Sequence, residues 1–172
     1  MPPPLGQKSG KKRKLQRQRI AAGPGKSYTN VAILFDTNIL LYRFDARFAK
    51  KQAIATKVLR DGLSAGNAFL MHQSIIEFVA ATTRPLSGAK PIFAMPEALR
   101  EAEEWINQFP VLYPDEILLR TALRGAVAYQ LSWFDAHIWA YAERYGIAEL
   151  YSEDFQHERY YGSVRAVNPF IT

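Results

Sequence analysis

The chain has 172 residues, a hydrophobic fraction of 48%, an aromatic fraction of 13% and a formal net charge of +6. These values are typical of one globular domain that can bury a core, and they exclude a fibrous or wholly disordered chain. The sequence contains no Cys, which excludes disulfides, zinc–thiolate sites and thiol nucleophiles. It also lacks a run of about 18 uncharged apolar residues of the kind that spans a bilayer. We therefore expect a soluble cytoplasmic protein with no membrane partner.

The positive charge is concentrated near the start of the chain. Residues 1–30 contain eight Lys or Arg and no acidic residue, so residues 31–172 have 14 basic against 16 acidic groups. A segment rich in Pro, Gly, Lys and Arg cannot bury enough apolar surface to offset its ordering entropy, and we expect it to be disordered. Its composition fits an RNA-binding arm, a nuclear-localisation-like patch or a solvated extension, and does not distinguish between them.

The domain begins with an alternation of strands and helices. The apolar run VAILF (31–35) is of strand length, as in a strand covered on both faces within a parallel sheet. The spacing of apolar residues over 46–63 predicts a helix that ends at the sequence SAGN. AFLM (68–71) predicts a second strand, and a second helix begins at about Gln73. Residues 84–91 contain Pro and Gly and predict a loop.

The same alternation continues to the end of the chain. Pro96 is placed as a first-turn proline of an amphipathic helix, and Gly146 is placed to end another. The remaining predictions are helices over 96–109, 114–131 and 134–145, and strands over 111–113, 148–152 and 164–167. Strands that alternate with helices predict a single α/β domain with a mostly parallel central sheet flanked by helices.

Four acidic residues occupy comparable places in this pattern. Asp36 directly follows the first strand, Glu77 lies early in the helix after the second, Asp135 opens a helix, and Asp154 follows a late strand. Sites in open α/β sheets form outside the carboxyl ends of the strands, so these side chains are expected at one edge. Clustered carboxylates repel one another unless a cation compensates, and oxygen ligands suit Mg²⁺ or Mn²⁺.

Five short motifs resemble one known family. "FDTNILLY", "QSIIEF", "SWFDAHIWA", "LYSEDFQ" and the closing "VNPF" are similar to the PIN domain, and especially to the VapC-type toxin ribonucleases of toxin–antitoxin systems. The resemblance covers residues 31–170. It implies one PIN-like nuclease domain over 31–172, an acidic pocket at the carboxyl edge of the sheet, and endonucleolytic hydrolysis of RNA with Mg²⁺ or Mn²⁺.

The resemblance also assigns roles to particular residues. By position, the catalytic and metal-binding residues would be Asp36, Glu77, Asp135 and Asp154, supported by the polar residues Thr37, Asn38 and Ser152. Glu153 competes with Asp154 for the fourth acidic place. Asp154 is preferred because the family has a hydroxyl residue two positions before this acid, and Ser152 matches it.

Basic residues outside the motifs are candidate RNA contacts. Arg84 and Lys90 flank the predicted loop near the helix of Glu77, while Arg47 and Lys50 lie on the helix predicted over 46–63. For the latter two, a solvated helix face is the preferred explanation. The family comparison further implies a cognate antitoxin that covers the acidic pocket, and often a homodimer. The cleaved RNA is left open, as is the choice between toxin and processing nuclease.

Two other functions compete with this interpretation. One is a non-catalytic RNA-binding protein with a PIN-like fold, in which only the basic tail acts. The other is a Mg²⁺-dependent phosphatase of the haloacid dehalogenase type, which is disfavoured because its chemistry resembles Asp-x-Asp and Asn38 stands at the second position. The three His residues lack zinc-site spacing. We expect the three Trp residues, Trp105, Trp133 and Trp139, in the core.

Overall fold

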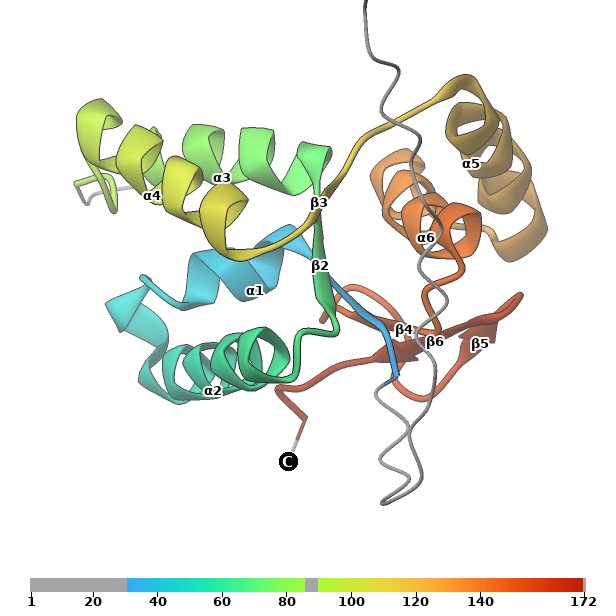
Figure 1. Ribbon diagram of the computed structural model, residues 1–172, viewed down its shortest axis with the longest axis horizontal. Helices are drawn as coiled ribbons and strands as arrows, with labels where there is room; N and C mark the ends of the chain where they lie inside the picture. Colours follow the sequence, from blue (N-terminus) through green and yellow to red (C-terminus); the bar gives the residue numbers. More distant parts are fainter. Residues whose placement is uncertain (1–30, 86–89, 172) are drawn as a thin grey trace, which may run out of the picture.

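A six-stranded sheet forms the centre of the molecule. The computed structural model describes residues 31–85 and 90–171 (Figure 1). Within these ranges the strand order is β3-β2-β1-β4-β6-β5. All neighbouring strands are parallel except β5, which pairs with β6 in the antiparallel sense. The strands are β1 (Ile33–Phe35), β2 (Ala68–Met71), β3 (Val111–Leu112), β4 (Glu149–Tyr151), β5 (Tyr160–Tyr161) and β6 (Val164–Val167).

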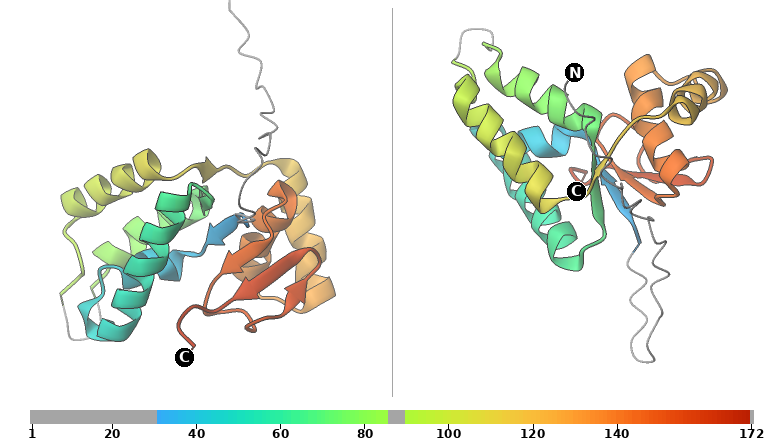
Figure 2. Two further views of the ribbon diagram at one scale, coloured as in Figure 1. Left: turned by 60° about the horizontal axis from the view of Figure 1, so that its bottom comes forward. Right: turned by 45° about the horizontal axis from the view of Figure 1, so that its top comes forward.

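Helices cover the sheet on both sides. Figures 1 and 2 show α1 to α4 on one side of the sheet and α5 and α6 on the other. The helices are α1 (Thr37–Tyr42), α2 (Ala49–Ala65), α3 (His72–Thr83), α4 (Met95–Gln108), α5 (Glu116–Tyr129) and α6 (Trp133–Tyr145), and the 3-10 helix η1 (Ala46–Phe48) precedes α2. The predicted fold class is therefore confirmed: this is one α/β domain with a mostly parallel sheet.

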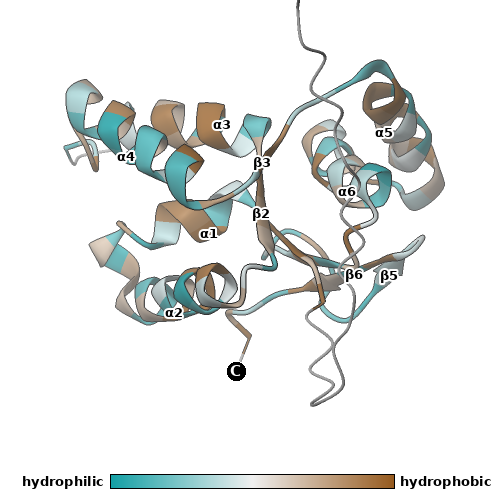
Figure 3. Ribbon diagram, in the orientation of Figure 1, coloured by the Kyte–Doolittle hydropathy of each residue, from teal (hydrophilic) through white to brown (hydrophobic). Residues whose placement is uncertain are grey.

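The central strand contributes to two separate cores. Successive side chains of a strand point to opposite faces, so Leu34 packs with α5 and α6 while Phe35 packs with α1 to α4. Both side chains are fully buried. The continuous apolar run in the sequence arises because both faces of β1 are covered. The neighbouring strand β2 is likewise hydrophobic along its length (Figure 3).

Local signals fix the ends of the helices that frame the sheet's carboxyl edge. Ser132 caps α6 by accepting a hydrogen bond from the backbone N–H of Asp135, and Gly146 ends the helix in the left-handed conformation. Asp115 caps α5 in the same way through Leu118. Each cap satisfies an N–H group that the first turn of a helix leaves without a partner. The start of α6, and with it Asp135, is therefore anchored in place.

Most predicted elements are present, with corrections at three points. The prediction of a helix from residue 114 is two residues early, because Asp115 is the cap and α5 begins at Glu116. The short strand β5 was missed, since two residues leave no periodic pattern. Trp133 is 45% exposed, so its placement in the core was wrong, whereas Trp105 and Trp139 are buried as expected.

Some sequence-based predictions fall outside the described part of the chain. The segment 1–30 lies outside it, as do residues 86–89 of the predicted loop. No helix in residues 31–85 and 90–171 is both long and apolar enough to cross a membrane.

Candidate active site

Asp36 lies at the junction between β1 and α1. It is the N-cap of α1, and its carboxylate accepts a hydrogen bond from the backbone N–H of Thr37. Capping by Asp is a common way to start a helix, yet this side chain is only 2% exposed. Burying a carboxylate is costly unless it is paired or compensated. The cap alone does not account for a carboxylate at this depth.

Ser152 and Asn38 connect Asp36 to the end of β4. The Ser152 hydroxyl donates to Asp36 Oδ2 over 2.6 Å, and Asn38 Nδ2 donates to the same oxygen over 2.8 Å. Asn38 Nδ2 also lies 3.2 Å from Asp154 Oδ2, so one amide bridges two carboxylates. The backbone N–H of Asp154 donates in turn to the Ser152 hydroxyl. The predicted supporting residues Asn38 and Ser152 therefore hold two of the predicted acids together.

Thr37 connects the same junction to α3. Its hydroxyl lies 2.6 Å from Glu77 Oε2 and 3.2 Å from the Ser74 hydroxyl. Gln73 donates to the other carboxylate oxygen of Glu77 over 2.7 Å. Both oxygens of Glu77 are thus held by neighbours, which fixes this carboxylate beside the end of β1.

Asp135 approaches the cluster from α6. Its carboxylate accepts a hydrogen bond of 2.7 Å from the Ser132 hydroxyl, next to the cap described above. Burial raises the pKa of Asp154, the bond from Asn38 opposes this, and the negative charge of Asp135 adds to the rise. Asp135 is therefore close enough to Asp154 to affect its ionisation.

The pKa of Asp36 is strongly raised, and burial is the main cause. Burial raises the pKa of Asp36 from 3.8 to about 7, although hydrogen bonds from Ser152 and Thr37 lower it. The charges of Asp154 and Glu77 contribute to the rise. Hydrogen bonds through Thr37, Asn38 and Ser152 thus link three of the predicted acids, Asp36, Glu77 and Asp154. Within the described residues, Asp135 is connected to them only through its charge. A carboxyl group that titrates near neutral pH marks a candidate functional site.

Glu153 is directed to a different set of partners. Its carboxylate forms an ion pair with Lys51 and accepts a hydrogen bond from the Tyr42 hydroxyl. Lys51 also lies over the ring of Tyr42, 4.3 Å from its centre. Because these contacts occupy Glu153, the geometry favours Asp154 as the fourth acid of the cluster. Lys51 was missed in the sequence, since nothing local reveals a contact between α2 and the segment after β4.

The candidate RNA-contacting residues are at the surface. Arg47 pairs with Asp45 across 2.6 Å, whereas Lys50, Arg84 and Lys90 are exposed. Arg84 and Lys90 lie on either side of residues 86–89, and only those four residues are outside the described part of this loop. Their role in RNA binding stays a prediction.

The atoms of the cluster are of the kind that bind Mg²⁺ or Mn²⁺, but they are not arranged as a complete set of ligands. All donors are carboxylate, amide or hydroxyl oxygens, and Asn38 Oδ1 is a buried oxygen that accepts no hydrogen bond. Among residues 31–85 and 90–171, however, no three Asp, Glu or His side chains are gathered as a ready ligand set. Mg²⁺ usually takes one or two protein carboxylates and completes its shell with water and substrate phosphate. The residues therefore fit an ion held by part of the cluster.

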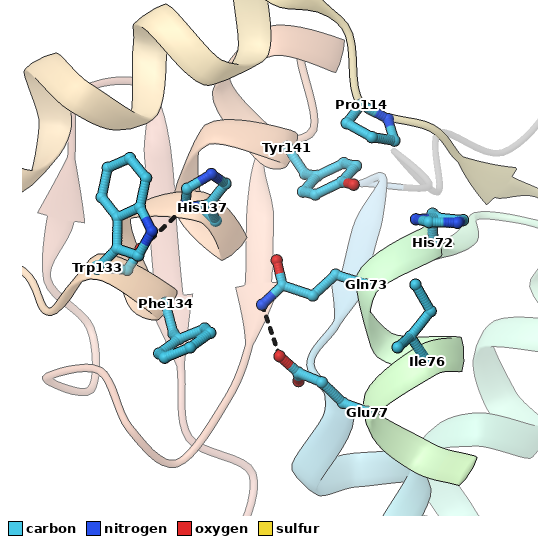
Figure 4. Close-up of a pocket in the computed structure, with 9 residues that line it drawn as sticks. All are labelled: His72, Gln73, Ile76, Glu77, Pro114, Trp133, Phe134, His137 and Tyr141. Atoms are coloured by element: carbon cyan, nitrogen blue, oxygen red, sulfur yellow. Dashed lines mark hydrogen bonds between the residues drawn. The ribbon is translucent and has the colours of Figure 1, made fainter. Parts of the chain in front are cut away.

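An open pocket of about 450 Å³ adjoins the acidic cluster (Figure 4). Its walls come from the start of α3, the start of α6 and the segment before α5. Glu77 belongs to both the pocket and the cluster. The lining residues are His72, Gln73, Ile76, Glu77, Pro114, Trp133, Phe134, His137 and Tyr141.

The fold and this acidic edge define an α/β domain of a known family. The PIN-domain family model matches residues 33–163. The chain therefore belongs to the PIN-domain family, and the resemblance stated from the sequence motifs is confirmed. No curated protein matches the chain at a significant level.

Solved structures share this fold at low sequence identity. A chain of a toxin–antitoxin complex from Klebsiella pneumoniae is 19% identical with a TM-score of 0.57, and the match covers 80% of this chain and 98% of that one. A chain of DNA-bound VapBC from Salmonella typhimurium is 13% identical with a TM-score of 0.58, and the match covers 79% of this chain and 96% of that one. The similarity extends over nearly the whole length of both relatives.

Proposed function

We propose that this protein is a divalent-metal-dependent endoribonuclease and the toxin of a type II toxin–antitoxin system. The observation that best supports this is the linked set of carboxylates at the sheet's carboxyl edge, in which burial and neighbouring charge raise the pKa of Asp36 to about 7. A PIN domain with such a cluster has the donors that a phosphodiester hydrolase requires. We propose catalytic and metal-binding roles for Asp36, Glu77, Asp135 and Asp154.

The polar neighbours position these acids. Asn38 keeps Asp36 and Asp154 at a fixed separation, and Thr37 orients Glu77 toward the end of β1. Ser152 orients Asp36 through its 2.6 Å bond. When bound, a Mg²⁺ or Mn²⁺ ion would supply an activated water for attack on phosphorus and would stabilise charge on the leaving oxygen. No side-chain nucleophile is needed for such a reaction.

The toxin assignment rests on the fold shared with chains from two toxin–antitoxin complexes. It includes a cognate antitoxin as partner and RNA in the cytoplasm as substrate. A homodimer is also part of the proposal, and light scattering of the purified chain measures it directly.

A non-catalytic RNA-binding protein is the second candidate. The acidic cluster argues against it, because several carboxylates placed together destabilise the fold unless they bind a cation. A Mg²⁺-dependent phosphatase of the Asp-x-Asp type has less support. Its second Asp would stand at position 38, where this chain has Asn38, whose amide donates a hydrogen bond to Asp36.

The test is cleavage of a panel of structured RNAs by the purified full chain with Mg²⁺, with Mn²⁺ and with EDTA. We expect internal cleavage with either ion and none with EDTA. If RNA is bound but left intact under all three conditions, the binding-protein alternative replaces the nuclease.

A further inference from the structure

We propose that the pocket between α3 and α6 holds one unpaired base of the RNA, next to the position where the strand is cut. The choice of RNA as the ligand rests on the proposed function. The pocket itself is argued from its lining residues, their exposure and its place beside the acidic cluster.

Two large aromatic side chains stand at the start of α6 without being buried. Phe134 is 66% exposed and Trp133 is 45% exposed, and both line the pocket. Two exposed rings next to each other leave apolar surface in water, at a cost to solubility that a bound partner would remove. Base–aromatic stacking is the usual way in which proteins hold single-stranded RNA.

The opposite wall of the pocket is also apolar and exposed. Ile76 on α3 is 56% exposed, and it faces the pocket across from the side chains of α6 (Figure 4). A flat base would contact a ring on one side and an aliphatic side chain on the other. The pocket therefore has two apolar walls with an open mouth, as a stacked and unpaired base requires.

Each apolar wall is followed in the sequence by an acid of the cluster. Ile76 precedes Glu77 on α3, and Phe134 precedes Asp135 on α6. Glu77 lines the pocket and accepts a hydrogen bond from Thr37, which adjoins Asp36. A nucleotide with its base in the pocket would thus have its backbone at the acidic edge.

Polar groups inside the pocket are placed to contact the edge of a base. His72, His137 and the Gln73 amide line it together with Tyr141. The Tyr141 hydroxyl is protonated at neutral pH, as an ordinary phenol is, and burial raises its pKa further. The His137 ring is held at 3.0 Å from the Trp133 carbonyl oxygen and meets the Trp133 ring edge to face. His137 therefore packs against the Trp133 part of the aromatic wall.

The test measures binding of RNA without cleavage. A single-stranded RNA octamer is titrated with the full chain in EDTA. The octamer contains one internal fluorescent adenine analogue, and stacking on an aromatic ring quenches the emission of this analogue. A second octamer has an abasic residue at the same position. We compare wild type with Phe134→Ala and with a matched control, Tyr160→Ala, because Tyr160 is 65% exposed on β5 and does not line the pocket.

We expect quenching by wild type and by Tyr160→Ala, and weaker binding of the abasic octamer. Phe134→Ala should raise the Kd about five- to a hundredfold, the range for loss of one base–aromatic stack. Phe134→Leu should also bind weakly and Phe134→Tyr should bind normally, since only the latter keeps a ring. Wild-type affinity in Phe134→Ala or Phe134→Leu would overturn the proposal, as would equal affinity for the abasic octamer.

The same proteins are then assayed for cleavage of RNA in Mg²⁺. This assay separates the base-pocket proposal from the nuclease proposal. Cleavage by wild type with an unchanged KM in Phe134→Ala would remove the base pocket and leave the nuclease intact. Failure of wild type to cleave any RNA would refute the nuclease, and the measurements in EDTA would still decide on the pocket.

Discussion

Replacing Asp36 by Asn should stabilise the fold at neutral and alkaline pH. Asn keeps the shape of Asp but has no charge, whereas the wild-type carboxylate is buried and has a pKa raised from 3.8 to about 7. That difference converts to about 4 kcal/mol at 1.36 kcal/mol for each pH unit. The amide accepts fewer hydrogen bonds than the carboxylate, and loss of one or two costs about 1 kcal/mol each. The expected net gain is about 2 to 3 kcal/mol above pH 7.

The gain should depend on pH in a direction that follows from proton linkage. The folded protein binds a proton at Asp36 more tightly than the unfolded chain does, because burial raises the pKa in the folded state. The wild type therefore loses stability as the pH rises from about 4 to about 7, and changes little through this group outside that window. The variant has no such dependence. Its advantage should appear between these pH values and disappear in acid.

The assay is urea unfolding of wild type and Asp36→Asn in EDTA at pH 5, 7 and 8, at equal protein concentration. The difference in the free energy of unfolding cancels most contributions from other titrating groups. A variant that is less stable than wild type at pH 8, or a difference that does not change with pH, would refute the assignment of a destabilising buried charge.

Three further predictions follow from named contacts. Mg²⁺ at ten times its Kd should raise the melting temperature of wild type by about 3 to 5 °C and leave Asp36→Asn unchanged, measured by differential scanning fluorimetry; an equal rise in both proteins would place the ion elsewhere. Lys51→Met removes the ion-pair partner of Glu153, which keeps only its hydrogen bond from Tyr42; turnover of RNA should fall by up to about 100-fold with the melting temperature little changed, because the uncompensated charge of Glu153 perturbs the adjacent Asp154, and unaltered kcat would contradict this. Gly125→Ala would place a Cβ atom 2.1 Å from the Trp139 ring between α5 and α6; urea unfolding should show a loss of about 1 to 3 kcal/mol, and wild-type stability would show that the two helices can separate.

The order of the elements could be predicted from the sequence because each has a local signal. The apolar run before Asp36 marks a buried strand. The proline in the first turn of α4 and the glycine after α6 mark helix ends whose backbone geometry suits one residue type. The pairing of β4 with β1 could not be predicted, because it joins residues more than a hundred positions apart. The pairing of β4 with β6 could not be predicted either, because it depends on which edge of the sheet remains free.

The places of the four proposed site acids in the fold could be predicted from the sequence, but their connections could not. Asp36, Glu77, Asp135 and Asp154 each follow a strand or lie near the start of a helix, so a parallel sheet brings them to one edge. The contact of Lys51 with Glu153 depends on how α2 packs, and no pattern in the sequence encodes it.

The aromatic pocket was not predicted either. Apolar context placed Trp133 in the core, whereas both Trp133 and Phe134 are exposed at the start of α6. Hydrophobic residues at the start of a helix give no indication of whether a neighbouring element covers them.

We propose that the Asp36 carboxylate, at the end of β1, is required for RNA hydrolysis. The most direct test compares cleavage of one structured RNA in Mg²⁺ by wild type, Asp36→Asn and the control Asp61→Asn, whose exposed side chain pairs with Lys57 away from the cluster. We predict that wild type and Asp61→Asn cleave the RNA in a reaction that EDTA stops, and that folded Asp36→Asn does not. Full cleavage by Asp36→Asn would show that this carboxylate is not required.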